Sequence, residues 1–188
     1  MILVNSDLVH KTDLLPVRHL IFEDHKDFDR ITEHYPLLGY LSLNYPDGSK
    51  FLDIGTRRGA SAIAMSLNPK VQVDSYDIHD FGCGNRIKAE NISFHIDNIL
   101  NDLKRVLQYG LILIDIDPHG GGEEERLVNF LKDNDWKGVL VIDDIGGSWK
   151  HMRKMWEEID LIKYNVTAFG HASGTGIIDY GDNIKVEL

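Results

Sequence analysis

Short apolar runs alternate with amphipathic segments along most of this chain. Two runs, 111–116 and 138–144, consist mainly of aliphatic residues, which is typical of strands buried on both faces of a sheet. Residues 124–134, between them, carry their apolar side chains at helical spacing. Similar patterns predict strands over 50–55, 71–78 and 92–96, and helices over 59–68, 98–108 and a segment for which Ser148 is the expected N-cap.

This repeated alternation of strand and helix predicts an α/β fold, a Rossmann-like, doubly wound and mostly parallel sheet. Two last segments, 164–169 and 174–180, are joined by a glycine-containing loop and predict a C-terminal antiparallel hairpin. The length of 188 residues favours a single domain over 1–188, with residues 1–49 as an N-terminal helical cover and 50–188 as its core. Within the cover we expect one helix over 27–35, stopped before Pro36, and a second short helix after that proline.

The turn after the first core strand carries the first candidate chemistry. It reads DIGTRRGAS over residues 53–61, and ligands of open parallel sheets bind beyond such strand ends. Gly55 and Gly59 let the backbone turn sharply and approach a ligand closely. The spacing departs from the dinucleotide fingerprint, and Asp53 would repel a diphosphate but suits an ammonium group. The turn therefore favours a zwitterionic ligand, although a glycine pair after a strand is also common for structural reasons alone.

Asp77 ends the second core strand, 24 residues after Asp53 (77 − 53). A carboxylate at this position can accept both hydroxyls of a ribose, as in dinucleotide-binding folds. A solvated aspartate in an ordinary turn is the alternative. Together with the glycine turn, the spacing favours the ribose interpretation.

Three carboxylates end two later strands. Asp115 follows one aliphatic run, and Asp143 and Asp144 follow the next. Because neighbouring parallel strands lie about 4.8 Å apart, these side chains should converge and repel one another unless a cation lies between them. Oxygen ligands suit Mg²⁺, Mn²⁺ or Ca²⁺, whereas aspartates that merely cap the following helices are the alternative.

The segment FLDIGTRRGASAIAMS, residues 51–66, resembles the cofactor motif of class I S-adenosylmethionine-dependent methyltransferases. More narrowly, it resembles the catechol O-methyltransferase branch and the macrocin O-methyltransferase and cephalosporin-hydroxylase-like group, over about residues 50–182. The resemblance implies a cofactor-binding core in which Asp53 lies near the methionyl amine, Ser61 binds the carboxylate, Asp77 binds the ribose, and Asp97 or Asn98 lies near the adenine. The complete expected cofactor set is Asp53, Gly55, Thr56, Arg57, Gly59, Ser61, Asp77, Ile78, Asp97, Asn98 and Asp115.

The resemblance also implies a Mg²⁺ site, because Asp115, Asp143 and Asp144 fall on the metal positions of the metal-dependent members. The ion would hold two substrate oxygens and lower the pKa of one hydroxyl. The chain departs from the catechol enzymes at Pro118, where those enzymes carry a lysine base. His119 is the expected general base, acting beside Asp115, and an ordinary loop histidine is the alternative.

Other histidines receive weaker expectations. Those at 10, 19, 25 and 34 lack H-x-x-x-H spacing, so we assign them no metal role. His171 and Ser173 lie in the predicted hairpin loop, where they either reach the mouth of the site or face solvent.

Net charge and composition exclude some classes of binding partner. A formal charge of −10 argues against a protein that neutralises nucleic-acid phosphates, and no apolar run reaches the length of a membrane span. The single cysteine and the absence of a signal-peptide pattern fit a cytoplasmic protein. We expect a methyltransferase that acts on the hydroxyl of a small molecule, with no nucleic-acid or membrane partner; pairing of two copies through the N-terminal region stays open. The alternatives are a metal-independent N-methyltransferase and a non-catalytic, nucleoside-binding Rossmann-like module.

Overall fold

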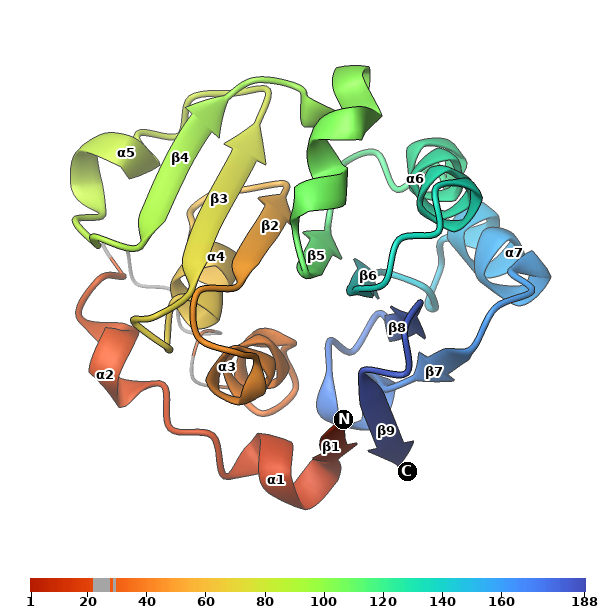
Figure 1. Cartoon of the computed structure of the whole chain (residues 1–188), viewed down its shortest axis with the longest axis horizontal. Coiled ribbons are helices and arrows are strands. Elements are labelled where there is room, and N and C mark those ends of the chain that lie inside the picture. The colour runs from red at the N-terminus through yellow and green to blue at the C-terminus, as the bar shows by residue number, and fades with distance from the viewer. Residues whose placement is uncertain (22–27, 29) are drawn as a thin grey trace.

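A computed structural model describes residues 1–21, 28 and 30–188 and contains one central sheet with helices on both faces (Figure 1). Seven strands lie in the order β4-β3-β2-β5-β6-β8-β7. All neighbouring strands are parallel except β8, which runs antiparallel to both β6 and β7. The strands are β2 (Lys50–Ile54), β3 (Gln72–Asp77), β4 (Ile92–Ile96), β5 (Leu111–Ile114), β6 (Val139–Asp143), β7 (Lys163–Asn165) and β8 (Thr175–Asp179). The predicted α/β fold with a C-terminal antiparallel hairpin is therefore confirmed.

Helices cover the two faces of this sheet. One face packs against α3 (Tyr35–Asn44) and α4 (Ala60–Met65), and the other against η1 (Ile99–Gln108), α6 (Gly122–Asp133) and α7 (Lys150–Glu158). Alternate strand residues serve the two sides, since Leu111 and Leu113 belong to the first core and Ile112 and Ile114 to the second. All four are buried, which explains why this strand reads as a continuous aliphatic run.

The strand order reverses beside β2. The chain winds from β2 outward to β3 and β4 on one side, and then returns through η1 to β5 on the other side. The loops that leave β2 and β5 therefore diverge at their carboxyl ends, which is where open α/β sheets bind ligands. The topology alone places the glycine turn after β2 and Asp115 after β5 on the rim of one crevice.

The N-terminal region differs from the expected pair of helices. Residues 31–34 form a turn and a bend, and α3 begins at Tyr35 with Pro36 in its first turn. The prediction that a helix over 27–35 stops before Pro36 is wrong in its described part, because a proline needs no amide partner in a first turn and so starts the helix; residues 27 and 29 lie outside the described residues. The region also contains α1 (Ser6–His10) and α2 (Leu15–Arg18).

Two short strands at the ends of the described chain escaped the sequence analysis. β1 (Ile2–Asn5) pairs in parallel with β9 (Ile184–Glu187) to form a separate two-stranded sheet. Figure 1 shows the two termini side by side at this pairing. Each strand has only four residues, too few to show a periodic pattern, and its partner lies at the other end of the sequence.

Three local predictions need correction. The segment 98–108 is a 3₁₀ helix with a kink at Asp102, whose φ of −137° and ψ of 80° are not helical. Ser148 does not cap the helix after β6, because α7 has Trp149 as its N-cap residue without a side-chain cap bond. Of the hairpin segment predicted over 164–169, only the start is strand, because η2 (Thr167–Phe169) follows β7. A further short helix, α5 (Cys83–Arg86), precedes β4.

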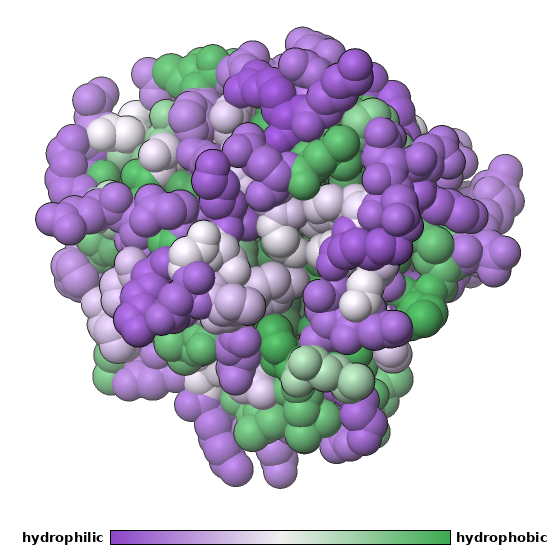
Figure 2. Space-filling view, in the orientation of Figure 1, coloured by the Kyte–Doolittle hydropathy of each residue, from purple (hydrophilic) through white to green (hydrophobic). Residues whose placement is uncertain are grey.

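Hydrophilic residues cover most of the face seen in Figure 2, with hydrophobic residues in small separate groups. Among the described residues, none of the helices combines the length and the apolar character that crossing a bilayer requires.

Candidate functional site

The described part of the chain has a cavity of about 600 Å³ at the carboxyl ends of the central strands. Its walls come from the turn after β2, the ends of β3 and β4, and the loops after β5 and β6. The N-terminal segment before α3 and the loop before β8 complete it. The structure brings together all but two of the residues predicted for the site. Those that line the cavity are Gly55, Thr56, Arg57, Ser61, Asp77, Ile78, Asp97, Asn98, Asp115, His119, Asp143 and Asp144.

Gly55 allows β2 and β5 to approach closely at the cavity floor. Its φ is +105°, and a Cβ atom placed there would lie 1.7 Å from the carbonyl oxygen of Asp115. No side chain larger than hydrogen fits this position without separating the strands. The glycine predicted from the motif is thus required by backbone geometry.

Asp53 and Gly59 are the two predicted residues that do not line the cavity. Asp53 is completely buried, and its Oδ2 accepts a hydrogen bond of 2.6 Å from the Ser75 hydroxyl. Burial raises the pKa of Asp53, although the nearby serine hydroxyls oppose the shift. Gly59 faces the opposite side, where an added Cβ would lie 2.5 Å from Ile87 Cδ1. Both residues support the turn from beneath.

Two backbone amides fix the orientation of the Asp77 carboxylate at the end of β3. Its Oδ2 accepts a hydrogen bond of 2.9 Å from the backbone N–H of Arg57, and its Oδ1 accepts one of 2.9 Å from the N–H of His79. A carboxylate has about four lone-pair sites, so each oxygen retains acceptor capacity for a ligand. The two amides fix the orientation of a group whose free lone pairs can meet the hydroxyls of a sugar.

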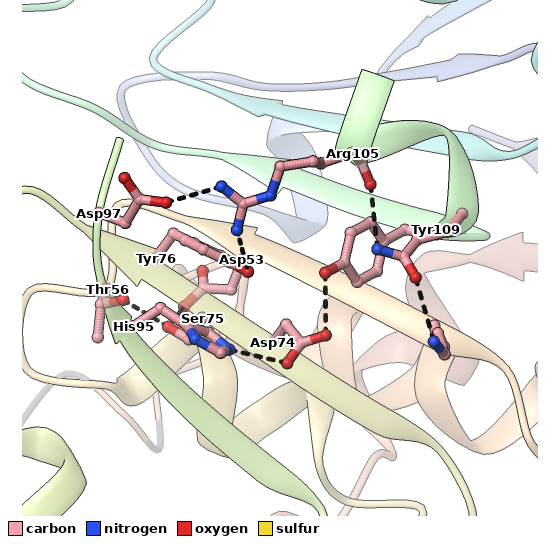
Figure 3. Close-up of polar contacts among 11 residues, drawn as sticks. Asp53, Thr56, Asp74, Ser75, Tyr76, His95, Asp97, Arg105 and Tyr109 are labelled. Carbon is pink, nitrogen blue, oxygen red and sulfur yellow. Dashed lines mark hydrogen bonds and ion pairs between the residues drawn. The ribbon is translucent and has the colours of Figure 1, made fainter. Parts of the chain in front are cut away.

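A chain of side chains closes the β4 side of the cavity (Figure 3). Arg105 donates from Nη1 to Asp97 Oδ2 over 2.7 Å and from Nη2 to the Tyr76 hydroxyl over 3.0 Å. The Tyr76 ring stacks on His95 with centroids 4.3 Å apart. The hydrogen bond from Arg105 lowers the pKa of Asp97. Asn98 has a structural task, because its side chain caps η1 by accepting from the N–H of Leu100.

The opposite end of the cavity is acidic. One ligand atom each from Asp115, His119 and Asp144 lies within 4.8 Å of the other two. His119 Nε2 lies 3.1 Å from Asp144 Oδ2 and 3.1 Å from Asp117 Oδ1. Burial, reinforced by the carboxylate of Asp143, raises the pKa of Asp115 to about 7. This carboxyl group therefore holds a proton easily unless positive charge arrives.

Asp143, although next in sequence to Asp144, faces a different group. Its Oδ1 lies 3.4 Å from His34 Nδ1, and its Oδ2 lies 3.0 Å from His171 Nδ1. The positive φ of Asp144, 58°, turns the chain directly after β6. Asp144 Oδ2 therefore faces His119, while its Oδ1 shares His171 with Asp143 at a longer distance of 3.8 Å. Burial alone would raise the pKa of Asp143, but the two imidazoles lower it well below its usual range.

The same contacts act on the histidines. Hydrogen bonding to Asp143 raises the pKa of His171 to about 9. Burial alone would lower the pKa of His34, but the Asp143 carboxylate raises it. His171 thus reaches the mouth of the site rather than solvent alone.

Sequence reasoning missed several lining residues. His34 received no metal role because its spacing to other histidines is irregular, yet the structure places it beside Asp143. Its partners come from elements far apart in the chain, so spacing within one segment carries no signal. Arg105 does not line the cavity but holds Asp97, and its place near the end of an amphipathic helix that follows Asp97 could have indicated this role. His25 lies outside the described residues.

No protein-family model matches this chain, and no curated protein sequence matches it either. Solved structures do share its fold. The SAH-bound methyltransferase PaMTH1 of Podospora anserina has a TM-score of 0.62 at 13% identity, covering 94% of this chain and 88% of that chain. A putative caffeoyl-CoA O-methyltransferase from Staphylococcus aureus has a TM-score of 0.54 at 15% identity, covering 93% and 91%.

The plantazolicin methyltransferase BpumL, in complex with SAH, has a TM-score of 0.55 at 11% identity and covers 93% of this chain and 95% of that chain. At such identities the likeness establishes the fold alone. The class that fold and cavity define is an α/β protein with the Rossmann-like sheet of the methyltransferases.

Proposed function

We propose that this protein is an S-adenosylmethionine-dependent methyltransferase that transfers the methyl group to a hydroxyl of a small molecule with the help of a divalent ion. One observation carries the proposal. A single cavity joins a glycine turn and an oriented strand-end carboxylate at one end to a buried acidic group at the other. A methyl donor and an acceptor can meet between those ends. The neighbouring folds in complex with SAH support the same donor.

At the donor end, the residues act by binding and orienting. Asp77 accepts the ribose hydroxyls, and Asp97, or the backbone at Asn98, contacts the adenine. Ser61 receives the methionyl carboxylate, the turn at Thr56 and Arg57 borders it, and Ile78 packs on the nucleoside. Asp53 and Gly59 support the turn from below, so their contribution to binding is indirect. The reaction requires alignment more than covalent chemistry from the protein.

The acidic end fits a divalent cation. Asp144 Oδ1 is buried without a hydrogen-bond partner among the described residues, and one ligand oxygen of Asp144 lies within 4.8 Å of one of Asp115. Oxygen donors of this kind match Mg²⁺ or Mn²⁺. Asp115 and Asp144 would hold the ion, with Asp143 as the third carboxylate that the family resemblance implies. When bound, such an ion lowers the pKa of a substrate hydroxyl.

His119 is the proposed general base. Its Nε2 lies 3.1 Å from a carboxylate oxygen of Asp117 and 3.1 Å from one of Asp144, so the two carboxylates orient the ring. Its ring also packs against Trp149, with centroids 4.6 Å apart, so the imidazole is held in place. Proton uptake by His119 would leave Asp115 free to counter the positive charge of the donor.

One observation favours a second candidate. Both oxygens of Asp143 face imidazoles, so this carboxylate does not join Asp115 in the present geometry. A metal-independent N-methyltransferase, in which Asp115 and Asp144 contact a substrate amine directly, would use the site without an ion. Turnover that is unaltered by a chelator would select it. Binding without turnover across a broad acceptor panel would instead select the non-catalytic module.

Calorimetry tests the donor assignment. We expect S-adenosylmethionine and S-adenosylhomocysteine to bind with one-to-one stoichiometry to the purified protein, with or without EDTA. Turnover with a panel of hydroxyl and amine acceptors, assayed with Mg²⁺ and with EDTA, then separates the candidates. Undetectable binding of both nucleosides would refute the proposed function.

A further inference from the structure

Three side chains from distant parts of the chain meet beside the acidic group. His34 precedes α3, Asp143 ends β6, and His171 lies in the loop before β8. One ligand atom from each lies within 4.8 Å of the other two. The two imidazole rings stand edge to face, with centroids 5.9 Å apart. This set, called here the His34–Asp143–His171 group, combines two nitrogen donors with one carboxylate.

Two atoms of this group are buried without a hydrogen bond. His34 is 3% exposed and Asp143 is 4% exposed, yet neither His34 Nδ1 nor Asp143 Oδ1 has a hydrogen-bond partner among the described residues. The two atoms lie 3.4 Å apart and form an ion pair when His34 is protonated, without hydrogen-bond geometry. A buried polar atom that is left without a partner is costly, so natural proteins seldom retain one without a reason. A shared cation between them would satisfy both atoms.

His171 has the surroundings of a metal ligand. Its Nε2 lies 3.5 Å from Glu33 Oε2, while its Nδ1 makes a hydrogen bond of 3.0 Å with Asp143 Oδ2, which a metal ion bound by both residues would replace. Ligating histidines usually direct their second ring nitrogen to a carboxylate, which fixes the tautomer and leaves the other nitrogen free to coordinate. Ser173 Oγ, 2.7 Å from Nδ1, adds a neutral oxygen to the same group.

The backbone around His171 is also held in place. Its N–H donates to Thr175 Oγ1 over 2.7 Å, and its carbonyl accepts from the N–H of Gly174 over 2.9 Å. The neighbouring carbonyl of Ser173 accepts from the N–H of Gly146, directly after the two aspartates. The loop and the end of β6 are therefore fixed relative to each other before any ligand arrives.

We propose that the His34–Asp143–His171 group is a second cation site that binds a first-row transition metal ion such as Zn²⁺ or Co²⁺ in preference to Mg²⁺. Imidazole nitrogen suits these ions, whereas Mg²⁺ prefers oxygen ligands alone. Bonds of about 2.0–2.2 Å to each donor require only small side-chain movements from the present separations. Asp143 is shared, because the proposed function also assigns it to the magnesium site. The two sites are therefore told apart by residues that belong to only one of them.

The experiment uses the full chain, freed of metal by a chelator and dialysed, without S-adenosylmethionine. Co²⁺ is titrated and followed by its visible absorption, with excess Mg²⁺ present to occupy the oxygen-rich group. We expect one equivalent of Co²⁺ to bind in the presence of Mg²⁺. His171→Gln should weaken this binding at least about 100-fold, since it removes a ligand rather than a supporting contact. His34→Gln should do the same.

Two variants control the test. His95→Gln removes another histidine that is paired with an aspartate, Asp74 at 3.0 Å. Among the described residues this pair belongs to no cluster of three metal-binding side chains, so Co²⁺ binding should not change. Asp115→Asn alters only the oxygen-rich group and should also retain Co²⁺. Thermal unfolding of each variant shows whether it folds. The half-exposed His171 keeps the test valid if replacement of the buried His34 prevents folding.

The proposal is overturned if the wild-type protein binds no Co²⁺ in the presence of Mg²⁺. It is also overturned if Co²⁺ binding survives His171→Gln but is lost in Asp115→Asn. Neither outcome bears on the proposed binding of S-adenosylmethionine, because nucleoside binding is measured separately. A failure of nucleoside binding likewise does not alter the Co²⁺ result.

Discussion

The two ends of the cavity satisfy their polar groups in different ways. At the donor end, Asp77 already accepts from two backbone amides and Asp97 accepts from Arg105. At the acidic end, Asp143 and Asp144 each bury an oxygen without a hydrogen-bond partner among the described residues. The first end is pre-organised by its own chain, whereas the second retains buried carboxylate oxygens without hydrogen bonds. A charged ligand would therefore change the acidic end far more than the donor end.

The most damaging change to the donor end is predicted at Gly55. Gly55→Ala would place a Cβ 1.7 Å from the Asp115 carbonyl oxygen and force β2 and β5 apart. We expect a loss of about 3 kcal/mol or more of unfolding free energy, together with loss of nucleoside binding. Denaturant unfolding and calorimetry measure the two effects.

Gly48→Ala is the matched control for this substitution. Gly48 also has a positive φ, +80°, but an added Cβ would meet no atom within 4 Å. It should cost only about 1 kcal/mol of backbone strain and leave nucleoside binding unchanged. Equal effects of the two alanines would mean that the close strand approach is unimportant.

Removal of divalent ions should separate the two ends completely. EDTA should abolish turnover because the buried carboxylates of the acidic end then lack a counter-charge, while S-adenosylhomocysteine should still bind at the donor end. Asp143→Ala should remove ion binding and likewise spare the nucleoside. An assay of turnover beside calorimetry checks both, and loss of nucleoside binding in EDTA would argue that the ends are not independent.

A smaller effect is expected at Asp77. Asp77→Asn keeps the shape but removes the charge that two amides now orient, so nucleoside affinity should fall about 10- to 100-fold. Asp80→Asn is the control. It changes a nearby carboxylate that accepts a hydrogen bond from the N–H of Gly82, and nucleoside affinity should stay the same. If both variants bind S-adenosylhomocysteine as the wild type does, Asp77 does not carry the ribose.

The smallest effect concerns Arg105, a positioning residue. Arg105→Gln breaks an exposed contact to Asp97 and a partly buried one to the Tyr76 hydroxyl. Exposed ion pairs contribute little to stability, so unfolding should hardly change. Nucleoside affinity should fall a few-fold, and Lys70→Gln, which breaks the exposed pair with Asp47, should leave it unchanged. A loss above about 100-fold would indicate that Arg105 contacts the ligand itself.

The two ends of the cavity also differ in how much of each could be predicted from the sequence. The donor end is built from consecutive strand ends, β2, β3 and β4, whose motifs are local, and nearly all of its predicted residues line the cavity. Pattern alone could not tell that Asp53 points beneath the turn, because burial of one carboxylate depends on Ser75 in the next strand.

The acidic end needed information that no single segment contains. Asp115, Asp143 and Asp144 were visible as strand-end carboxylates, but their grouping depends on the backbone turn at Asp144. His34 reaches the site because α3 begins at Tyr35 and not earlier, which was the point where the helix prediction was wrong. Partners supplied by tertiary packing leave no spacing to detect.

A crystal structure with S-adenosylhomocysteine and Mn²⁺ tests the central claim most directly. The account predicts ribose hydroxyls on Asp77, the sulfur directed toward Asp115, and anomalous density beside Asp115 and Asp144. A nucleoside bound elsewhere, or a Gly55 turn that touches no part of it, would contradict the account.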